Sequence, residues 1–175
     1  MRTNILLILP LVLSASAISA YAADAPAPAL QAQTPIQVSA DPKRFDLVTV
    51  DASQHRLLAA HSQAGTLTVI DLNTDKVVGE IAAADKVSGV AVDTADGKYF
   101  AGGIQGVAVV DSKTLKKTAF INTSGPTDDM AYDPASHTLY VSHDDGTELW
   151  VVDARKDAIT GHIDRSEERR VGKEV

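Results

Sequence analysis

Short segments rich in Val, Ile, Leu, Thr, Tyr and Ala recur along residues 45–164, and turn-forming residues such as Asp, Asn and Gly separate them. This pattern is typical of β-strands. It predicts twelve strands, at residues 46–51, 56–61, 66–71, 76–81, 88–93, 98–103, 106–111, 116–121, 128–133, 138–143, 147–153 and 157–163. Outside the N-terminal segment, no stretch of ten or more residues carries an amphipathic helical stripe, so the sequence indicates an all-β protein.

The strands fall into three copies of one repeat. Each copy has an aspartate after its first strand, an aspartate after its third strand and an isoleucine ten residues later. These landmarks are Asp51, Asp71 and Ile81; Asp93, Asp111 and Ile121; and Asp133, Asp153 and Ile163. Four strands in each 40–42 residues is the spacing of a β-propeller blade.

We therefore expect a β-propeller fragment of three four-stranded antiparallel blades, at residues 45–82, 87–122 and 127–164. The alternative is a β-sandwich or meander of about twelve strands, which the regular long period disfavours. Propellers have four or more blades, so missing blades or self-association are needed to cover the open faces. An uncovered apolar face also predicts poor solubility.

The N-terminal segment has the pattern of a secretory signal peptide over residues 1–22. Arg2 precedes the apolar residues 5–13, and Ala20, Tyr21 and Ala22 give a small-x-small cleavage site. The alternative is a membrane anchor. Residues 23–44 are expected to be a flexible leader with a possible stray strand at 35–39, which would complete the last blade of a full ring. A periplasmic or secreted location follows, without membrane insertion after cleavage.

The last eleven residues differ in composition from the rest. Residues 165–174 read RSEERRVGKE, which resembles the in-frame translation of a common sequencing adapter. We interpret residues 165–175 as a non-native tail, and the natural sequence is then known only to about Asp164. The alternative is a genuine charged tail or helix.

Charge and cysteine content narrow the possible partners. The formal net charge is −7 and no basic stripe is present, which argues against nucleic acid and anionic membranes as partners. The chain has no cysteine, so disulfides cannot contribute to its stability.

The repeat resembles the YVTN family of β-propeller repeats. Residues 139–143 read LYVSH at the position of the family's name motif, and residues 151–153 read VVD. Residues 68–81, TVIDLNTDKVVGEI, match the second half of the repeat, whereas residues 101–103 of the second copy, AGG, depart from it. The resemblance covers residues 46–163. It implies an exported propeller, mostly of seven blades and of uncharacterised function; some look-alikes are lactonases or quinoprotein dehydrogenase subunits.

Candidate ligand-binding residues lie on the face where the loops between second and third strands meet the loops between blades. Ligands often bind such loops because these vary on a rigid scaffold. The candidates are His61, His143, Asp144, Asp145, Asp128 and Asp129, with Thr127, Lys86 and Gln105 beside them. The four aspartates could bind calcium or a cationic ligand, or form a solvated turn.

The other polar landmarks are assigned structural roles. His61 and His143 share a repeat position but belong to blades separated by a third, so we expect no shared metal and interpret them as residues that hydrogen-bond their hairpins. The six strand-ending aspartates are expected to accept backbone hydrogen bonds in turns. No motif for a phosphate loop, nucleophile elbow, haem or zinc is present, so no catalytic residue, metal or cofactor is assigned.

These observations favour an exported, non-catalytic binding or scaffold protein of unknown ligand. Its partner would be a small molecule or an envelope protein. One alternative is a propeller enzyme, lactonase-like or quinoprotein dehydrogenase-like, with part of its active site in missing blades. A second alternative is a cell-envelope interaction protein. Function inferred from a fold is analogy alone.

Overall fold

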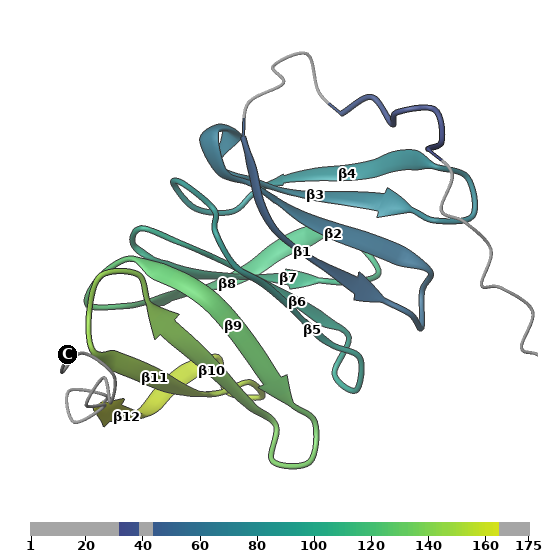
Figure 1. The fold of residues 1–175 in the computed structure, drawn as a ribbon. Helices are drawn as coiled ribbons and strands as arrows, with labels where there is room; N and C mark the ends of the chain where they lie inside the picture. The colour runs from purple at the N-terminus through teal and green to yellow at the C-terminus, as the bar shows by residue number, and fades with distance from the viewer. Residues whose placement is uncertain (1–31, 39–43, 165–175) are drawn as a thin grey trace, which may run out of the picture. The chain divides into compact units, whose positions relative to one another are not determined.

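The computed structural model describes residues 32–38 and 44–164 of the chain. These residues form three four-stranded antiparallel sheets and one 3₁₀ turn, Ser62–Ala64, and they contain no α-helix (Figure 1). Residues 32–38 carry no regular secondary structure. The strand at 35–39 was expected to pair with a further blade, and it stays a prediction; residue 39, the signal peptide and the tail lie outside the described residues.

Each sheet consists of four consecutive strands in sequential order, as expected for a propeller blade. Blade 1 contains β1 (Phe45–Asp51), β2 (Arg56–His61), β3 (Thr66–Asp71) and β4 (Lys76–Ala82). Blade 2 contains β5 (Val90–Asp93), β6 (Lys98–Gly103), β7 (Gly106–Asp111) and β8 (Lys116–Asn122). Blade 3 contains β9 (Thr127–Asp133), β10 (Thr138–His143), β11 (Glu148–Asp153) and β12 (Ala158–Asp164). The all-β fold and the three-blade fragment of a propeller are confirmed.

Strand β5 is shorter than predicted, because it begins at Val90 and not at residue 88. Here blade 2 touches the start of blade 3: the Ser88 hydroxyl donates to the Thr127 carbonyl at 2.7 Å. A Cβ at Gly89 would lie 2.1 Å from the Asp128 carbonyl oxygen, so only glycine allows this approach.

The core lies between the blades, because alternate residues of each strand point to opposite faces of its sheet. In blade 2, Tyr99 and Val110 belong to a fully buried cluster with Leu58 of blade 1. Their neighbours Phe100 and Val109 belong to a second cluster with Leu139, Trp150 and other residues of blade 3. We call the face toward the preceding blade the N-side face, and the face toward the following blade the C-side face.

The strand-ending aspartates shape the turns as the sequence predicts. Asp71 Oδ1 accepts backbone hydrogen bonds from Asn73 and Thr74, both at 2.9 Å. The aspartates that do the same at the other strand ends are Asp51, Asp93, Asp111, Asp133 and Asp153. Their recurrence therefore reflects turn geometry.

A buried polar network joins blades 1 and 2 at this turn end. Tyr99 of β6 donates to Asp51 Oδ2 at 2.8 Å, and Gln54 Nε2 donates to the Ser112 hydroxyl at 2.9 Å. Burial acts to raise the pKa of Asp51, but hydrogen bonds from Ser53, Tyr99 and the turn backbone outweigh it and hold that pKa below its usual value. Burial, together with the Asp51 carboxylate, raises the pKa of Tyr99 to about 12.

A second inter-blade bond repeats along the chain. The Arg56 guanidinium donates to the Ser112 carbonyl of blade 2, and the ammonium of Lys98, at the equivalent position, donates to the Ala154 carbonyl of blade 3 at 2.8 Å. The third copy carries Thr138 there. A basic side chain therefore bonds blade 1 to blade 2 and blade 2 to blade 3, whereas blade 3 has no basic residue at this repeat position.

We predict that Tyr99→Phe lowers the free energy of unfolding by about 1–2 kcal/mol, because it removes a buried bond to a charged acceptor. Urea denaturation measures the change. Tyr140→Phe is the matched control, because Tyr140 lies half-buried on the C-side face of blade 3, which no other blade among the described residues covers. Equal effects of the two substitutions would contradict the role of this network.

Candidate functional site

The first strands of the three blades, β1, β5 and β9, lie next to one another as the inner strands of the fragment. Two hollows lie along them. One is at the beginning of these strands and is polar; the other, which we call the apolar hollow, is toward their ends and is lined mainly by aliphatic residues, with hydroxyl-bearing residues among them.

The polar hollow, which we call the mouth cavity, has a volume of about 430 Å³. Its walls come from the residues before and at the start of each inner strand and from the loops between second and third strands. They are Arg44, Asp46, Ser62, Lys86, Ser88, Ile104, Pro126, Thr127, Asp128 and Asp144.

Nine of these ten residues, all but Thr127, occupy the same three repeat positions on the three blades. In blade 1 they are Arg44, Asp46 and Ser62. In blade 2 the equivalents, 42 residues later, are Lys86, Ser88 and Ile104, and in blade 3, a further 40 residues on, they are Pro126, Asp128 and Asp144. The mouth cavity is therefore built by the repeat itself, with a different chemical group on each blade.

The carboxylates give the cavity an acidic side. Desolvation by the cavity walls raises the pKa of Asp128, and the charges of Asp144, Asp129 and Asp46 raise it further. Arg44 pairs with Asp46 at 3.2 Å. The carboxylates of Asp128 and Asp144 have no hydrogen bond or ion pair within the described residues, so they are free to receive a cationic group.

Lys86 is the basic residue that blade 2 adds to the cavity. Its φ is +49°, in the left-handed region. The other non-glycine residues with positive φ, among those described, are all at two recurring turn positions: His55, His137, Asp75, Leu115 and Asp157. Lys86 is thus the exception to the turn pattern, and its strained backbone lies at the wall of the mouth cavity.

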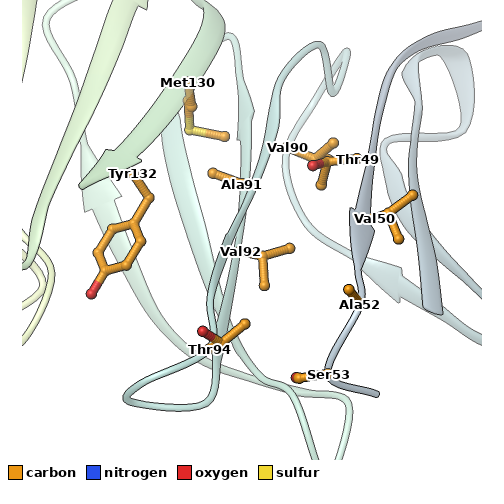
Figure 2. Close-up of a pocket in the computed structure, with 10 residues that line it drawn as sticks. All are labelled: Thr49, Val50, Ala52, Ser53, Val90, Ala91, Val92, Thr94, Met130 and Tyr132. Atoms are coloured by element: carbon orange, nitrogen blue, oxygen red, sulfur yellow. The ribbon is translucent and has the colours of Figure 1, made fainter. Parts of the chain in front are cut away.

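The apolar hollow, of about 510 Å³, lies toward the turn ends of the inner strands. Figure 2 shows Val92 of β5 on the side of β1, and Ala91 on the side of Met130 and Tyr132 of β9. This alternation is the one that builds the core between the blades. The hollow offers packing surface, and its polar groups are hydroxyls such as those of Thr49 and Thr94.

The structure brings only part of the predicted set together. Asp128, Asp144, Thr127 and Lys86 line the mouth cavity. Asp129 lies instead in a separate hollow on the C-side face of blade 3, and Gln105 lies in another hollow, between blades 1 and 2.

The remaining three candidates do not line the mouth cavity, and His143 lines a separate hollow with Gly146 and Glu148. Asp145 is largely exposed, and its Oδ1 lies 3.1 Å from His143 Nδ1 without forming a hydrogen bond. The His143 ring stacks on Trp150, with 4.9 Å between centroids. His61 is 1% exposed and stacks on Phe45 at 4.4 Å; neither of its nitrogens has a hydrogen-bond partner among the described residues. The interpretation of His61 as a hairpin hydrogen-bonding residue is therefore wrong.

Sequence reasoning missed six of the lining residues. They are Arg44, Asp46, Ser62, Ser88, Ile104 and Pro126. The signal that could have found them is the repeat period, because stepping back 40 and then 42 residues from Asp128 leads to Ser88 and Asp46. No group of three or more His, Cys, Asp or Glu residues is placed to hold a metal ion in the part of the chain that the structure describes.

Comparisons with known proteins support the fold and do not identify a family. No protein-family model and no curated protein matches the sequence. Among solved structures, the chain is similar to Kuenenia stuttgartiensis hydrazine synthase, with a TM-score of 0.64 and 19% identity over 74% of this chain and 40% of that chain. It is also similar to U3-55K, with a TM-score of 0.64 and 10% identity over 71% of this chain and 40% of that chain.

The chain thus spans well under half of both structures. At such identities the likeness shows the fold alone. The described residues contain no helix of the length and hydropathy needed to cross a membrane.

We predict that Asp144→Asn lowers the pKa of Asp128, because it removes the largest charge contribution that raises this pKa. Carboxyl ¹³C NMR titration follows the change. Because the pKa of Asp128 is raised in the folded state, ionisation of this carboxyl lowers the free energy of unfolding above the unfolded-state pKa, and protonation restores it as the pH falls. Asp144→Asn should therefore also raise the free energy of unfolding near neutral pH. Asp75→Asn, in a blade 1 turn, is the control, and an Asp128 pKa that stays unchanged in Asp144→Asn would refute the coupling.

Proposed function

We propose that this chain is part of an exported, non-catalytic β-propeller that binds a ligand bearing a cationic group in the mouth cavity. The observation that carries the proposal is the lining of that cavity, to which all three blades contribute equivalent positions. A site spread over several rigid sheets keeps its geometry, and its loops can vary without disturbing the core.

The charges in the cavity suggest which part of a ligand would enter it. Burial raises the pKa of Asp128 and the charge of Asp144 raises it further, so a cation near these two carboxylates would be favoured. Lys86 and Arg44 lie on the other blades and would favour an anionic or polar group at a distance from the cation. A small zwitterionic or amino-containing molecule fits this arrangement, and export would follow from the signal peptide expected at residues 1–22.

We expect amines to bind and their carboxylate analogues not to bind. The test is isothermal titration calorimetry with lysine, glucosamine and spermidine, and with glutarate and gluconate as matched anions. Asp128→Asn and Asp144→Asn should each weaken amine binding about tenfold or more, because each removes a charged partner. Rising salt should weaken it as well.

Asp145→Asn is the matched control, because Asp145 adjoins Asp144 but does not line the cavity. Amine affinity that is the same in Asp128→Asn as in Asp145→Asn would reject the mouth cavity as the site. Turnover of a lactone or an alcohol that depends on Asp128 would reject the non-catalytic assignment.

A further inference from the structure

Lys86 stands where the backbone of blade 2 departs from the repeat. In blades 1 and 3 the residue after the second strand donates its amide to the carbonyl of the residue at the Lys86 position. These two bonds run from Ser62 to Arg44 and from Asp144 to Pro126, each at 3.0 Å. In blade 2 the equivalent amide, that of Ile104, donates instead to the Asp85 carbonyl at 2.9 Å, one residue earlier. This shift by one residue accompanies the left-handed backbone of Lys86, whose φ is +49°.

A lysine is a costly choice for this backbone conformation. Any residue with a Cβ is strained there, and glycine, asparagine and aspartate adopt it most readily. The Lys86 side chain is exposed, and its ammonium makes no hydrogen bond or ion pair within the described residues. The side chain therefore contributes no polar bond that would offset the strain, and such outliers often mark a residue with a functional role.

The mouth cavity holds charges of both signs that do not pair across it. Lys86 of blade 2 lines the cavity together with Asp128 and Asp144 of blade 3, yet no ion pair joins Lys86 to either carboxylate. Arg44, the basic residue of blade 1, is paired with Asp46 at 3.2 Å. Among the described residues that line this cavity, one unpaired cation thus faces two unpaired carboxylates from the neighbouring blade. Such an arrangement complements a molecule that carries one carboxylate and one ammonium group.

We propose that Lys86 determines specificity in the mouth cavity, and that the ligand is a small amino acid whose carboxylate pairs with Lys86 while its ammonium lies at Asp128 and Asp144. The inference rests on the proposed function, because it assigns the second charge of a ligand that enters the same cavity. An amine without a carboxylate would bring an uncompensated cation into the cavity that holds the Lys86 ammonium. Lys86 therefore selects against simple amines as well as for amino acids.

The test is isothermal titration calorimetry of the 175-residue chain with γ-aminobutyrate and with butylamine, which differ by the carboxylate. The unsubstituted chain should bind γ-aminobutyrate about fivefold more tightly than butylamine, as expected for one partly exposed ion pair. Lys86→Gln should reduce this preference to less than about twofold, without weakening the binding of butylamine. Lys113→Gln is the matched control, because Lys113 is exposed in the turn after β7 and does not line the cavity, and it should keep the full preference.

A second variant, Lys86→Gly, separates the role of the side chain from that of the backbone. Glycine accepts the left-handed conformation without strain, so this variant should lose the preference for γ-aminobutyrate while its melting temperature rises by roughly 2 °C. A melting temperature that falls by several degrees would overturn the inference, because Lys86 would then serve the fold of the loop.

The two probes also distinguish failure of this inference from failure of the proposed function. If butylamine binds but γ-aminobutyrate binds no more tightly, or if the preference survives Lys86→Gln, the assignment of Lys86 is wrong and the cation site at Asp128 and Asp144 stands. If neither probe binds, the proposed function is rejected and this inference with it.

Discussion

The structure depends on one constraint: the sheet of blade 2 is apolar on both faces, so burying it requires a neighbouring sheet on each side. Blade 2 shows the constraint satisfied, because Tyr99 and Phe100 are consecutive in sequence, point to opposite sides and are both fully buried. At about 25 cal/mol per Å² of apolar area, such two-sided burial supplies most of the stability of the fragment. The polar bonds between blades, such as that from Tyr99 to Asp51, fix how neighbouring sheets are aligned.

The packing of the sheet faces also limits where a ligand can bind. The sheet faces are occupied by packing, which leaves the inner edge and the loops free for other chemistry. There the repeat places equivalent positions of each blade around one cavity while the side chains change, as at Asp46, Ser88 and Asp128. The mouth cavity thus has walls held by packed sheets and a lining that differs from blade to blade. The left-handed backbone of Lys86 is strained, and the packing of the neighbouring blades compensates for that strain.

The sequence predicts the fold well because strand pattern and turn chemistry agree at every level. Alternation and the strand-ending aspartates place all twelve strands within two residues of their observed bounds. The largest difference, two residues, is at the start of β5, where Gly89 contacts blade 3, a long-range packing effect that local sequence does not carry.

The lining of the mouth cavity was harder to predict from the sequence, because it too depends on contacts between segments far apart in the chain. Asp128 and Asp144 were found because acidic loop residues are conspicuous in sequence. Arg44 and Ser88 were missed because they resemble ordinary residues between strands until the repeats are superimposed in space. His61 was misread because its burial and its stacking on Phe45 arise only when β1 pairs with β2.

The measurement that tests the central claim most directly is amide hydrogen exchange of the 175-residue chain, resolved by strand. If burial between two neighbouring sheets is what stabilises a blade, β6 and β7 of blade 2, which are buried on both faces, should exchange more slowly than β10 and β11 of blade 3, which are fully buried on one face only. Exchange in β6 and β7 as fast as in β10 and β11 would contradict the account, because blade stability would then not depend on neighbours on both faces.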